Sequence, residues 1–483
     1  MTGTADADRI RQALAAGTRS GVETSQVKNA HPSIPLQLGQ RLIPWDLETR
    51  HILMVGTTGS GKSQAIYRNL EAIRARNQSA ILMDHSAEFL QRFYRPGVDV
   101  IFNPFDKRGV GWNVFNELRR IFDFDRIAQA CIPDDSAGQN KDWQMGAREL
   151  FANTLRQLWK LGKPFRTNKM LVHFLSHAPL RGAFPTDNDG RPIKSMQHFS
   201  LEELLRGTTS QRMFEPGNER GLPITMSIIS RYLTPFTYLK DGDFSVSDFV
   251  RSFEQGGDGR WLFMAYTDAN YAAIQSIFGF LASTAISAGL ELTESQERRF
   301  FYVLDELPSL GKLPALDDAL TKLRKRGGVV IAGIQSTAQI EDPDTYGRTG
   351  GQILLSCFGS VMMLRVMDDQ TAEKLSAMIG DVERWEENES SNLSSSSGVS
   401  GASSSESSGV SRSLQVRRAV LPSEFYTLPD LTGYARIGGT RMPHDAKTGR
   451  PYLAKVEYKA LPIVAEKEQP IDGLYLLDDM VAA

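Results

Sequence analysis

The sequence predicts an α/β protein in which a mostly parallel central sheet is interrupted by an all-α insertion. Short apolar runs alternate with helix-length segments near both ends of the chain, which is typical of βαβ units. Between them, residues 117–250 show helical periodicity and few β-branched runs. A glycine-rich stretch also follows the first apolar run directly and leads into a helical pattern.

The expected strands are apolar runs of four to six residues, short enough to be buried strands. Before the insertion these runs are 51–55, 80–84 and 98–102, with a helix expected over 62–76. Within the insertion, helices are expected over 142–161, 200–206 and 224–238. After the insertion the strand pattern resumes at 261–266, 300–304, 329–332 and 360–364.

Composition and charge narrow the class of protein. The 483 residues include 55 Lys and Arg against 57 Asp and Glu, so any nucleic-acid binding must come from local basic patches. The two cysteines, Cys131 and Cys357, exclude a disulfide-rich secreted scaffold and suit a reducing cytoplasm. Residues 271–290 carry no charge, but their serines, alanines and glycines favour a buried helix over a membrane span.

The glycine-rich stretch matches the P-loop pattern G-x-x-x-x-G-K-[ST]. Its residues are Gly56, Thr57, Thr58, Gly59, Ser60, Gly61, Lys62 and Ser63. Glycines let the backbone N–H groups curl around phosphates, and the following helix directs its positive end at the anion. We expect Lys62 to reach the β- and γ-phosphates and Ser63 to bind Mg²⁺, so the predicted cofactors are ATP and Mg²⁺.

A second motif, Walker B, is predicted where the apolar run 300–304 ends in Asp305 and Glu306. Asp305 would hold the Mg²⁺ shell, and Glu306 would polarise an attacking water. The second acid indicates hydrolysis rather than phosphorylation of a small substrate.

Three further positions at strand ends are candidates. Gln335 follows the run 329–332 and could sense the γ-phosphate, or it could be a surface or capping residue. Arg365 follows the run 360–364 and is either a solvated edge residue or a finger that stabilises transition-state charge, within the subunit or across an interface. Asp84 could contact the Mg²⁺ shell or the sheet edge. The basic cluster 322–326 is either a solvated helix end or a phosphate-backbone contact.

The chain resembles the type IV coupling proteins, the TrwB/TraD-like DNA-transport ATPases of conjugation. The resemblance spans most of residues 48–440. Besides the P-loop, its motifs are 103–117, 241–245, 305–322 continuing to 333–336, and the Leu-Pro-Asp-Leu sequence at 428–431.

The resemblance implies a RecA-like nucleotide-binding domain with an inserted all-α domain, and a homo-hexameric ring around single- or double-stranded DNA. It implies partners in a relaxase–DNA complex and a type IV secretion channel, and a place at the cytoplasmic face of the bacterial inner membrane for full-length relatives. It implies that Lys62 and Ser63 bind the phosphates and Mg²⁺, and that Asp305 and Glu306 form Walker B. It also implies that Gln335 is the sensor and Arg365 the arginine finger.

The expected organisation has four parts: a lead-in (1–45), a first nucleotide-binding segment (46–116), the all-α domain (117–250) and a second nucleotide-binding segment (251–483). Within the last part, the serine-rich residues 387–413 are expected to form a flexible loop, because they cannot bury enough apolar surface to offset ordering.

Two departures from the family pattern stand out. Relatives usually begin with two membrane helices, which this sequence does not show, so either a shortened chain or a soluble variant is compatible with it. Many relatives also have a Pro-Lys-Gly-Glu-like turn after the second strand, whereas here His85, Ser86, Ala87 and Glu88 follow Asp84.

Two alternative functions remain open at this point. The chain could be a protein-recruiting platform in which the helical insertion and the C-terminal part bind partners and ATP mainly gates assembly. It could also be another hexameric P-loop DNA translocase. The first alternative predicts weak turnover without DNA stimulation, and the long match at 305–336 argues against the second.

Overall fold

A nine-stranded sheet forms the centre of the protein. The computed structural model describes residues 34–133, 141–181, 200–218, 221–314, 316–398, 401–446 and 448–471. The strands are β3 (Ile52–Val55), β4 (Ala80–His85), β5 (Val100–Phe102), β6 (Trp261–Tyr266), β7 (Phe300–Leu304), β8 (Gly328–Ile334), β9 (Ser360–Met363), β12 (Thr432–Ile437) and β13 (Ala454–Lys455). Their order is β13-β12-β9-β3-β8-β7-β4-β6-β5, and all neighbours from β9 to β5 are parallel.

The seven expected strands are therefore present, and the α/β class with a parallel-rich sheet is confirmed. The sequence did not predict β12 and β13, which extend the sheet antiparallel beyond β9. A separate small ribbon, β1 (Gln37–Leu38) with β2 (Arg41–Leu42), precedes helix α2 (Trp45–Glu48).

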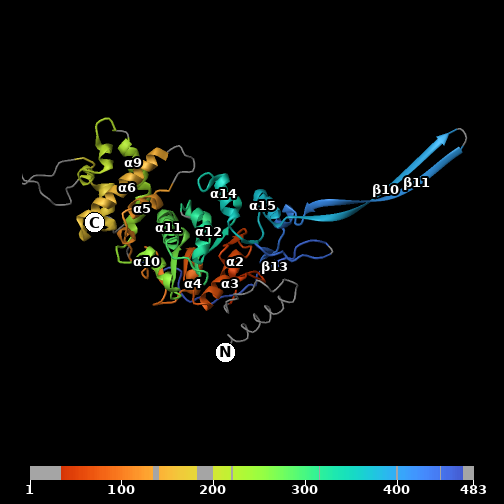
Figure 1. Cartoon of the computed structure of the whole chain (residues 1–483), viewed down its shortest axis with the longest axis horizontal. Coiled ribbons are helices and arrows are strands. Elements are labelled where there is room, and N and C mark those ends of the chain that lie inside the picture. The colour runs from red at the N-terminus through yellow and green to blue at the C-terminus, as the bar shows by residue number, and fades with distance from the viewer. Residues whose placement is uncertain are drawn as a thin grey trace, which may run out of the picture.

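Helices cover both faces of the sheet because its strands are apolar on both faces. On β3, Ile52 and Met54 face one core and Leu53 and Val55 face the other. The first core is closed by α3 (Lys62–Ala75) and α4 (Glu88–Phe93). The second is closed by helices on the opposite side of the sheet (Figure 1), namely α11 (Asp268–Gly289), α12 (Leu316–Lys322), α14 (Gly347–Ser356) and α15 (Asp369–Ile379).

The uncharged segment 271–290 lies almost entirely in helix α11. Of the helices in the described ranges, it is the one long and apolar enough to cross a membrane, yet 72% of its most apolar window is buried inside the protein. Ile274, Phe278 and Leu281 lie in the core beneath the sheet. The prediction of a buried helix is confirmed.

Among its described residues, the segment between β5 and β6 contains helices and turns but no strand beyond the isolated bridges Trp112–Phe244 and Asp106–Pro470. Its main helices are α5 (Asp123–Cys131), α6 (Lys141–Leu161), α7 (Asn168–Val172), α8 (Leu201–Leu204), α9 (Gly221–Leu233) and α10 (Val246–Arg251). Short 3₁₀ or π turns join them at Val114–Glu117, Lys163–Phe165, His173–His177, Thr209–Phe214, Thr234–Tyr238 and Ser252–Gln255. This region forms one end of the molecule in Figure 1, and its core is continuous with the α11 side of the sheet.

Glu117 joins two of the sequence motifs at the root of this helical region. Its buried carboxylate accepts hydrogen bonds from Trp112 Nε1 (2.8 Å), from the backbone N–H of Val246 (2.7 Å) and Ser247 (2.9 Å), and from Ser245 Oγ (3.2 Å). The motif at 103–117 therefore caps α10, directly after the motif at 241–245.

The serine-rich segment differs from the expected loop. Strands β10 (Asp381–Gly398) and β11 (Gly401–Arg418) pair antiparallel along their whole length, and Figure 1 shows this ribbon projecting far from the rest of the molecule. The expectation of a loop over 387–413 is wrong in this respect, because a β ladder is made by backbone groups and does not require apolar side chains. Short helices α13 (Thr337–Glu341) and α16 (Pro422–Tyr426) complete this part of the chain.

Candidate nucleotide site

The P-loop connects the central strand β3 to helix α3. Gly59 and Gly61 have φ values of 78° and 108°, in the left-handed region that favours glycine. A Cβ on Gly61 would also lie 2.7 Å from Leu431 Cδ2. The first N–H groups of the 14-residue helix α3, including those of Lys62 and Ser63, have no partner within the helix and are suited to binding an anion.

Parallel strands bring three of the predicted residues together at one edge of the sheet. Lys62 Nζ lies 2.9 Å from Glu306 Oε2, and Gln335 Nε2 donates a hydrogen bond to the same oxygen at 3.2 Å. Lys62 and Glu306 are largely buried, with side-chain exposures of 11% and 14%. Because β8, which ends just before Gln335, lies between β3 and β7, the three groups meet beside the P-loop.

The acidic pair has unused oxygen atoms. Asp305 Oδ1 and Glu306 Oε1 are buried and have no hydrogen-bond partner among the described residues. Burial raises the pKa of Asp305 to about 7, while the positive charge of Lys62 opposes the rise. Uncompensated buried carboxylate oxygens are costly, and hard divalent cations prefer such ligands. The residues present therefore fit Mg²⁺ at Asp305, with Ser63 in the first turn of α3 as the predicted second ligand.

Arg365 lies beside the P-loop of its own chain. Its backbone oxygen accepts a hydrogen bond from the N–H of Thr57 at 2.9 Å. Its guanidinium pairs with Asp430 Oδ1 (2.6 Å) and donates to the backbone oxygen of Leu428 (3.3 Å). The backbone and the side chain of Arg365 thus both contact segments that border the P-loop of the same chain.

Asp84 has a structural role. Its two carboxylate oxygens accept backbone hydrogen bonds from Phe89 (3.1 Å) and Leu90 (2.7 Å) at the start of α4. Burial raises its pKa to about 8, and these two bonds oppose the rise. The reading of Asp84 as a sheet-edge residue therefore describes its contacts better than the reading as a Mg²⁺-shell residue.

The turn after Asp84 keeps an unusual backbone without glycine. Ser86 and Ala87 have φ values of 72° and 53°, in the left-handed region that favours glycine. Glu88 closes the turn, accepts a hydrogen bond from Tyr67 (2.8 Å) and contributes to the raised pKa of Asp305. The sequence analysis did not single out Glu88 as a site residue.

The basic cluster 322–326 lies away from this site. It ends just before β8 begins, whereas the P-loop follows the end of the parallel neighbour β3. The cluster is therefore at the opposite edge of the sheet. Lys322 pairs with Asp318 at 2.6 Å, as expected of a solvated helix end.

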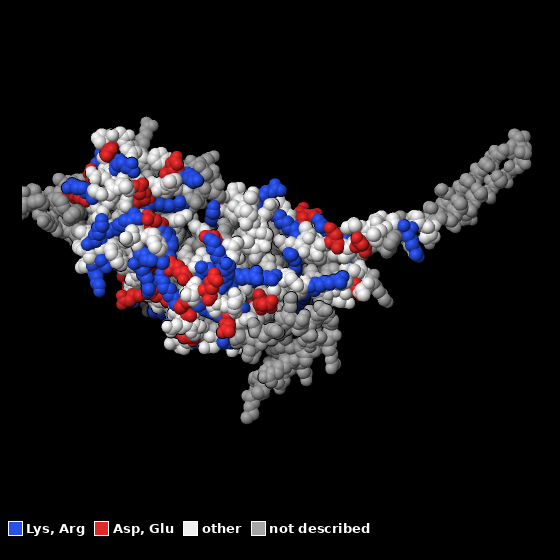
Figure 2. Space-filling view, in the orientation of Figure 1, with Lys and Arg blue, Asp and Glu red and all other residues white. Residues whose placement is uncertain are grey.

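Positive charge elsewhere on the surface is mixed with negative charge. Figure 2 shows Lys and Arg side chains gathered over the helical end of the molecule with acidic groups between them. Arg120, Arg126 and Arg251 all pair with Glu291. The face seen in Figure 2 is a patchwork rather than a single positive field, in agreement with the net charge of −2.

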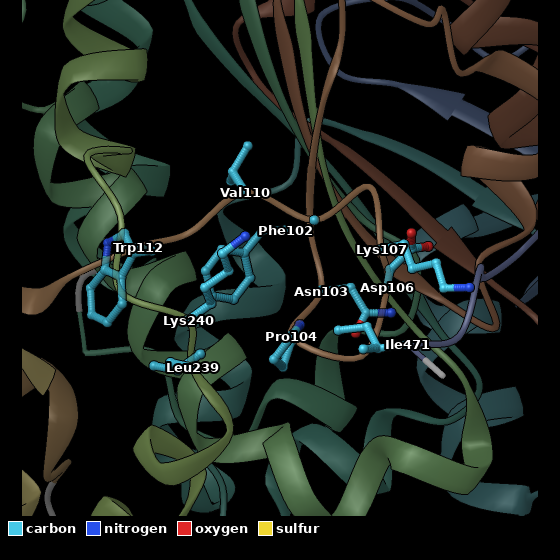
Figure 3. A pocket seen from close by; sticks show the side chains of 11 residues that line it. Phe102, Asn103, Pro104, Asp106, Lys107, Val110, Trp112, Leu239, Lys240 and Ile471 are labelled. Atoms are coloured by element: carbon cyan, nitrogen blue, oxygen red, sulfur yellow. The ribbon is translucent and has the colours of Figure 1, made fainter. Parts of the chain in front are cut away.

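A cavity of about 50 Å³ lies at the other end of the sheet, beyond β5 (Figure 3). Phe102, Trp112 and Lys240 line it together with Ile471. Its acidic group, Asp106, is already paired with Arg108 at 2.6 Å. The cavity is distant in strand order from β3 and is not part of the nucleotide site.

Together, the parallel sheet, the glycine turn before α3 and the acidic pair beside Lys62 define a P-loop NTPase with an α-helical insertion. A family model described as "Type IV secretion-system coupling protein DNA-binding domain" matches residues 35–445. The chain belongs to this family, and the resemblance drawn from the sequence is confirmed.

Two named relatives support this assignment. Coupling protein TraD of Escherichia coli (strain K12) is 28% identical over 449 residues, which is 90% of this chain and 56% of that protein. The chain thus spans a little over half the length of this curated relative. The unbound structure of the conjugative coupling protein TrwBdeltaN70 has 27% identity and a TM-score of 0.73, covering 92% of each chain.

Nucleotide-bound structures of TrwB are also similar. One is in complex with the non-hydrolysable ATP analogue ADPNP, and another is in complex with ADP and Mg²⁺. Each has 28% identity and a TM-score of 0.72, covering 90% of this chain and 91% of the other.

Proposed function

We propose that this chain is the motor part of a conjugative coupling protein, which hydrolyses ATP with Mg²⁺ to move DNA. The observation that carries the proposal is the convergence of Lys62, Glu306 and Gln335 beside the P-loop. The TrwB complexes with an ATP analogue and with ADP and Mg²⁺ support the choice of cofactors.

Each site residue has a role that follows from its position. Ser63 and Asp305 would hold Mg²⁺, which supplies charge neutralisation for the phosphates. Residues 56–63 cradle the phosphates through backbone N–H groups. Lys62 leaves Glu306 to contact the β- and γ-phosphates.

Glu306 is then the proposed general base. Its Oε1 has no partner among the described residues, so it can accept a proton from the attacking water. Gln335 holds Oε2 and fixes the orientation of the carboxylate. Arg365 would stabilise developing charge from within the same subunit.

The assembly and its partners are part of the same proposal. The family description names a DNA-binding domain, which supports DNA as a partner. We propose a homo-hexameric ring at the cytoplasmic face of the bacterial inner membrane, which receives a relaxase–DNA complex and passes it to a type IV secretion channel. The domain division at residues 46, 117 and 251 belongs to this proposal.

A second candidate is the protein-recruiting platform. The projecting ribbon β10–β11 favours it, because a strand pair that leaves the body of the protein presents backbone edges to a partner. The two functions are compatible within one protein.

The steady-state ATPase rate separates the two candidates. The purified chain is assayed across protein concentration, with and without single- or double-stranded DNA, and Lys62→Ala gives the background. A rate that rises with DNA and steepens with concentration supports the motor. A rate at the Lys62→Ala background under every condition contradicts it and favours the platform.

A further inference from the structure

Residues 428–431, which we name the P-loop latch, lie directly on the P-loop although they follow it by more than 360 residues. The N–H of Leu431 donates to the backbone oxygen of Ser60 at 2.9 Å. A Cβ on Gly61 would lie 3.1 Å from Leu431 Cα, so the two backbones are in contact there. The conformation of the latch and that of the P-loop are therefore coupled.

Arg365 connects the same two segments through its side chain. Its backbone is bonded to Thr57 at the start of the P-loop, while its guanidinium binds Asp430 and Leu428 in the latch. The side chain of Arg365 is 27% exposed and that of Asp430 is 61% exposed. An ion pair this exposed contributes little net stability, so another anion can displace Asp430.

We propose that Asp430 is a positioning residue that holds Arg365 until the γ-phosphate of ATP takes its place on the guanidinium. This inference rests on the proposed function. A phosphate competes well for arginine because it accepts charge-assisted, bidentate hydrogen bonds. ADP lacks the γ-phosphate and leaves the Arg365–Asp430 pair intact, so the pair distinguishes a triphosphate from a diphosphate.

A series of contacts connects the latch, which contains Asp430, to the projecting ribbon. The latch follows α16, whose last residue, Tyr426, donates a hydrogen bond from its hydroxyl to Asp369 at the start of α15 (2.7 Å). Helices α15 and α16 are the two elements that flank β10 and β11 in sequence. A latch that loosens with ATP therefore acts on the segment that roots the ribbon.

The test compares nucleotide affinities of Asp430→Asn and wild type by calorimetry on the whole chain, with a non-hydrolysable ATP analogue and with ADP. Removing the competing charge should raise the affinity for the ATP analogue about threefold to fivefold relative to that for ADP. The ADP affinity should stay within about twofold, which also checks that the variant is folded. In an Arg365→Ala background, Asp430→Asn should have no effect on this ratio.

Asp381→Asn is the matched control, because it breaks a similarly exposed pair with Arg418 (2.9 Å) at the root of the ribbon. It should leave the ratio unchanged. A ratio that is unchanged or falls in Asp430→Asn, or that still rises without Arg365, overturns the inference alone. Failure of the wild type to bind either nucleotide overturns the proposed function and this inference with it.

Discussion

Lys62 Nζ lies 2.9 Å from Glu306 Oε2. The lysine of the P-loop, which follows β3, thus forms an ion pair with the second acid of Walker B, which follows β7. The pair is largely buried, and its charges compensate each other. A nucleotide phosphate would replace Glu306 as the partner of Lys62. Binding would then free the carboxylate next to the position of the attacking water.

Lys62→Ala should abolish turnover and weaken ATP binding by at least about tenfold, because it removes the cation that meets the phosphates. Titration calorimetry and phosphate release measure the two effects. Lys459→Ala is the control, since Lys459 forms an exposed pair with Glu71 on α3 and should change neither quantity. Full ATPase activity in Lys62→Ala would contradict the assignment of Lys62 to the nucleotide site.

Gln335→Ala should lower kcat by about ten- to a hundredfold while KM for ATP changes little. The amide holds Glu306 Oε2, so its loss disorders the proposed base without removing a phosphate contact. Steady-state kinetics separate the two parameters. A rise in KM with unchanged kcat would show that Gln335 serves binding instead.

Glu117→Gln should lower the free energy of unfolding by about 2–3 kcal/mol. The NH₂ group of the glutamine would face buried hydrogen-bond donors and leave some of them without an acceptor. The carboxylate now accepts bonds from Trp112, Ser245, Val246 and Ser247. Urea denaturation of the whole chain measures the change. Glu457→Gln, at a side chain that is 73% exposed, should have no measurable effect.

Because the buried ring of His51 resists protonation, the free energy of unfolding should fall as the pH decreases from about 6.5 to about 4. Val330 N–H donates to its Nδ1 (3.1 Å) and its Nε2–H donates to the Leu320 oxygen (3.0 Å), which describes a neutral ring. Burial lowers its pKa from 6.5 to about 4. The unfolded chain therefore binds a proton below about pH 6.5 that the folded chain accepts only near pH 4, and stability falls across this window as pH decreases.

The loss should be about 3 kcal/mol between pH 7 and pH 4. Urea denaturation of wild type and His51→Gln at several pH values isolates this contribution. The wild type should lose more stability than His51→Gln over the window. Parallel pH profiles for the two proteins would contradict the assignment of a buried neutral histidine.

Much of the site could be predicted because each group follows a strand-like run. Lys62, Asp305 and Gln335 all stand after apolar segments, and the carboxyl ends of parallel strands meet at one edge of a sheet. Asp84 stands in the same kind of position, but two backbone N–H groups already occupy its oxygens. A strand-end acid alone does not distinguish these cases.

Other features carry no local signal in the sequence. Asp430 pairs with Arg365, although the two strands of the ribbon lie between them in the sequence. Strand β12 contains glycine and arginine rather than an apolar run. Composition predicted that residues 387–413 bury no core, but backbone pairing of β10 with β11 does not depend on apolar side chains. The Arg365–Asp430 pair and the pairing of β9 with β12 join segments that are far apart in the sequence, so the residues near each partner do not indicate them.

Single-turnover ATP hydrolysis by wild type and Glu306→Gln tests the proposed chemistry most directly. Both proteins should bind ATP with Mg²⁺, since Glu306 is not assigned to the phosphates. Phosphate release by Glu306→Gln should be at least about a hundredfold slower, because the amide cannot accept the proton of the attacking water. Release at the wild-type rate would contradict the assignment of Glu306 as the base.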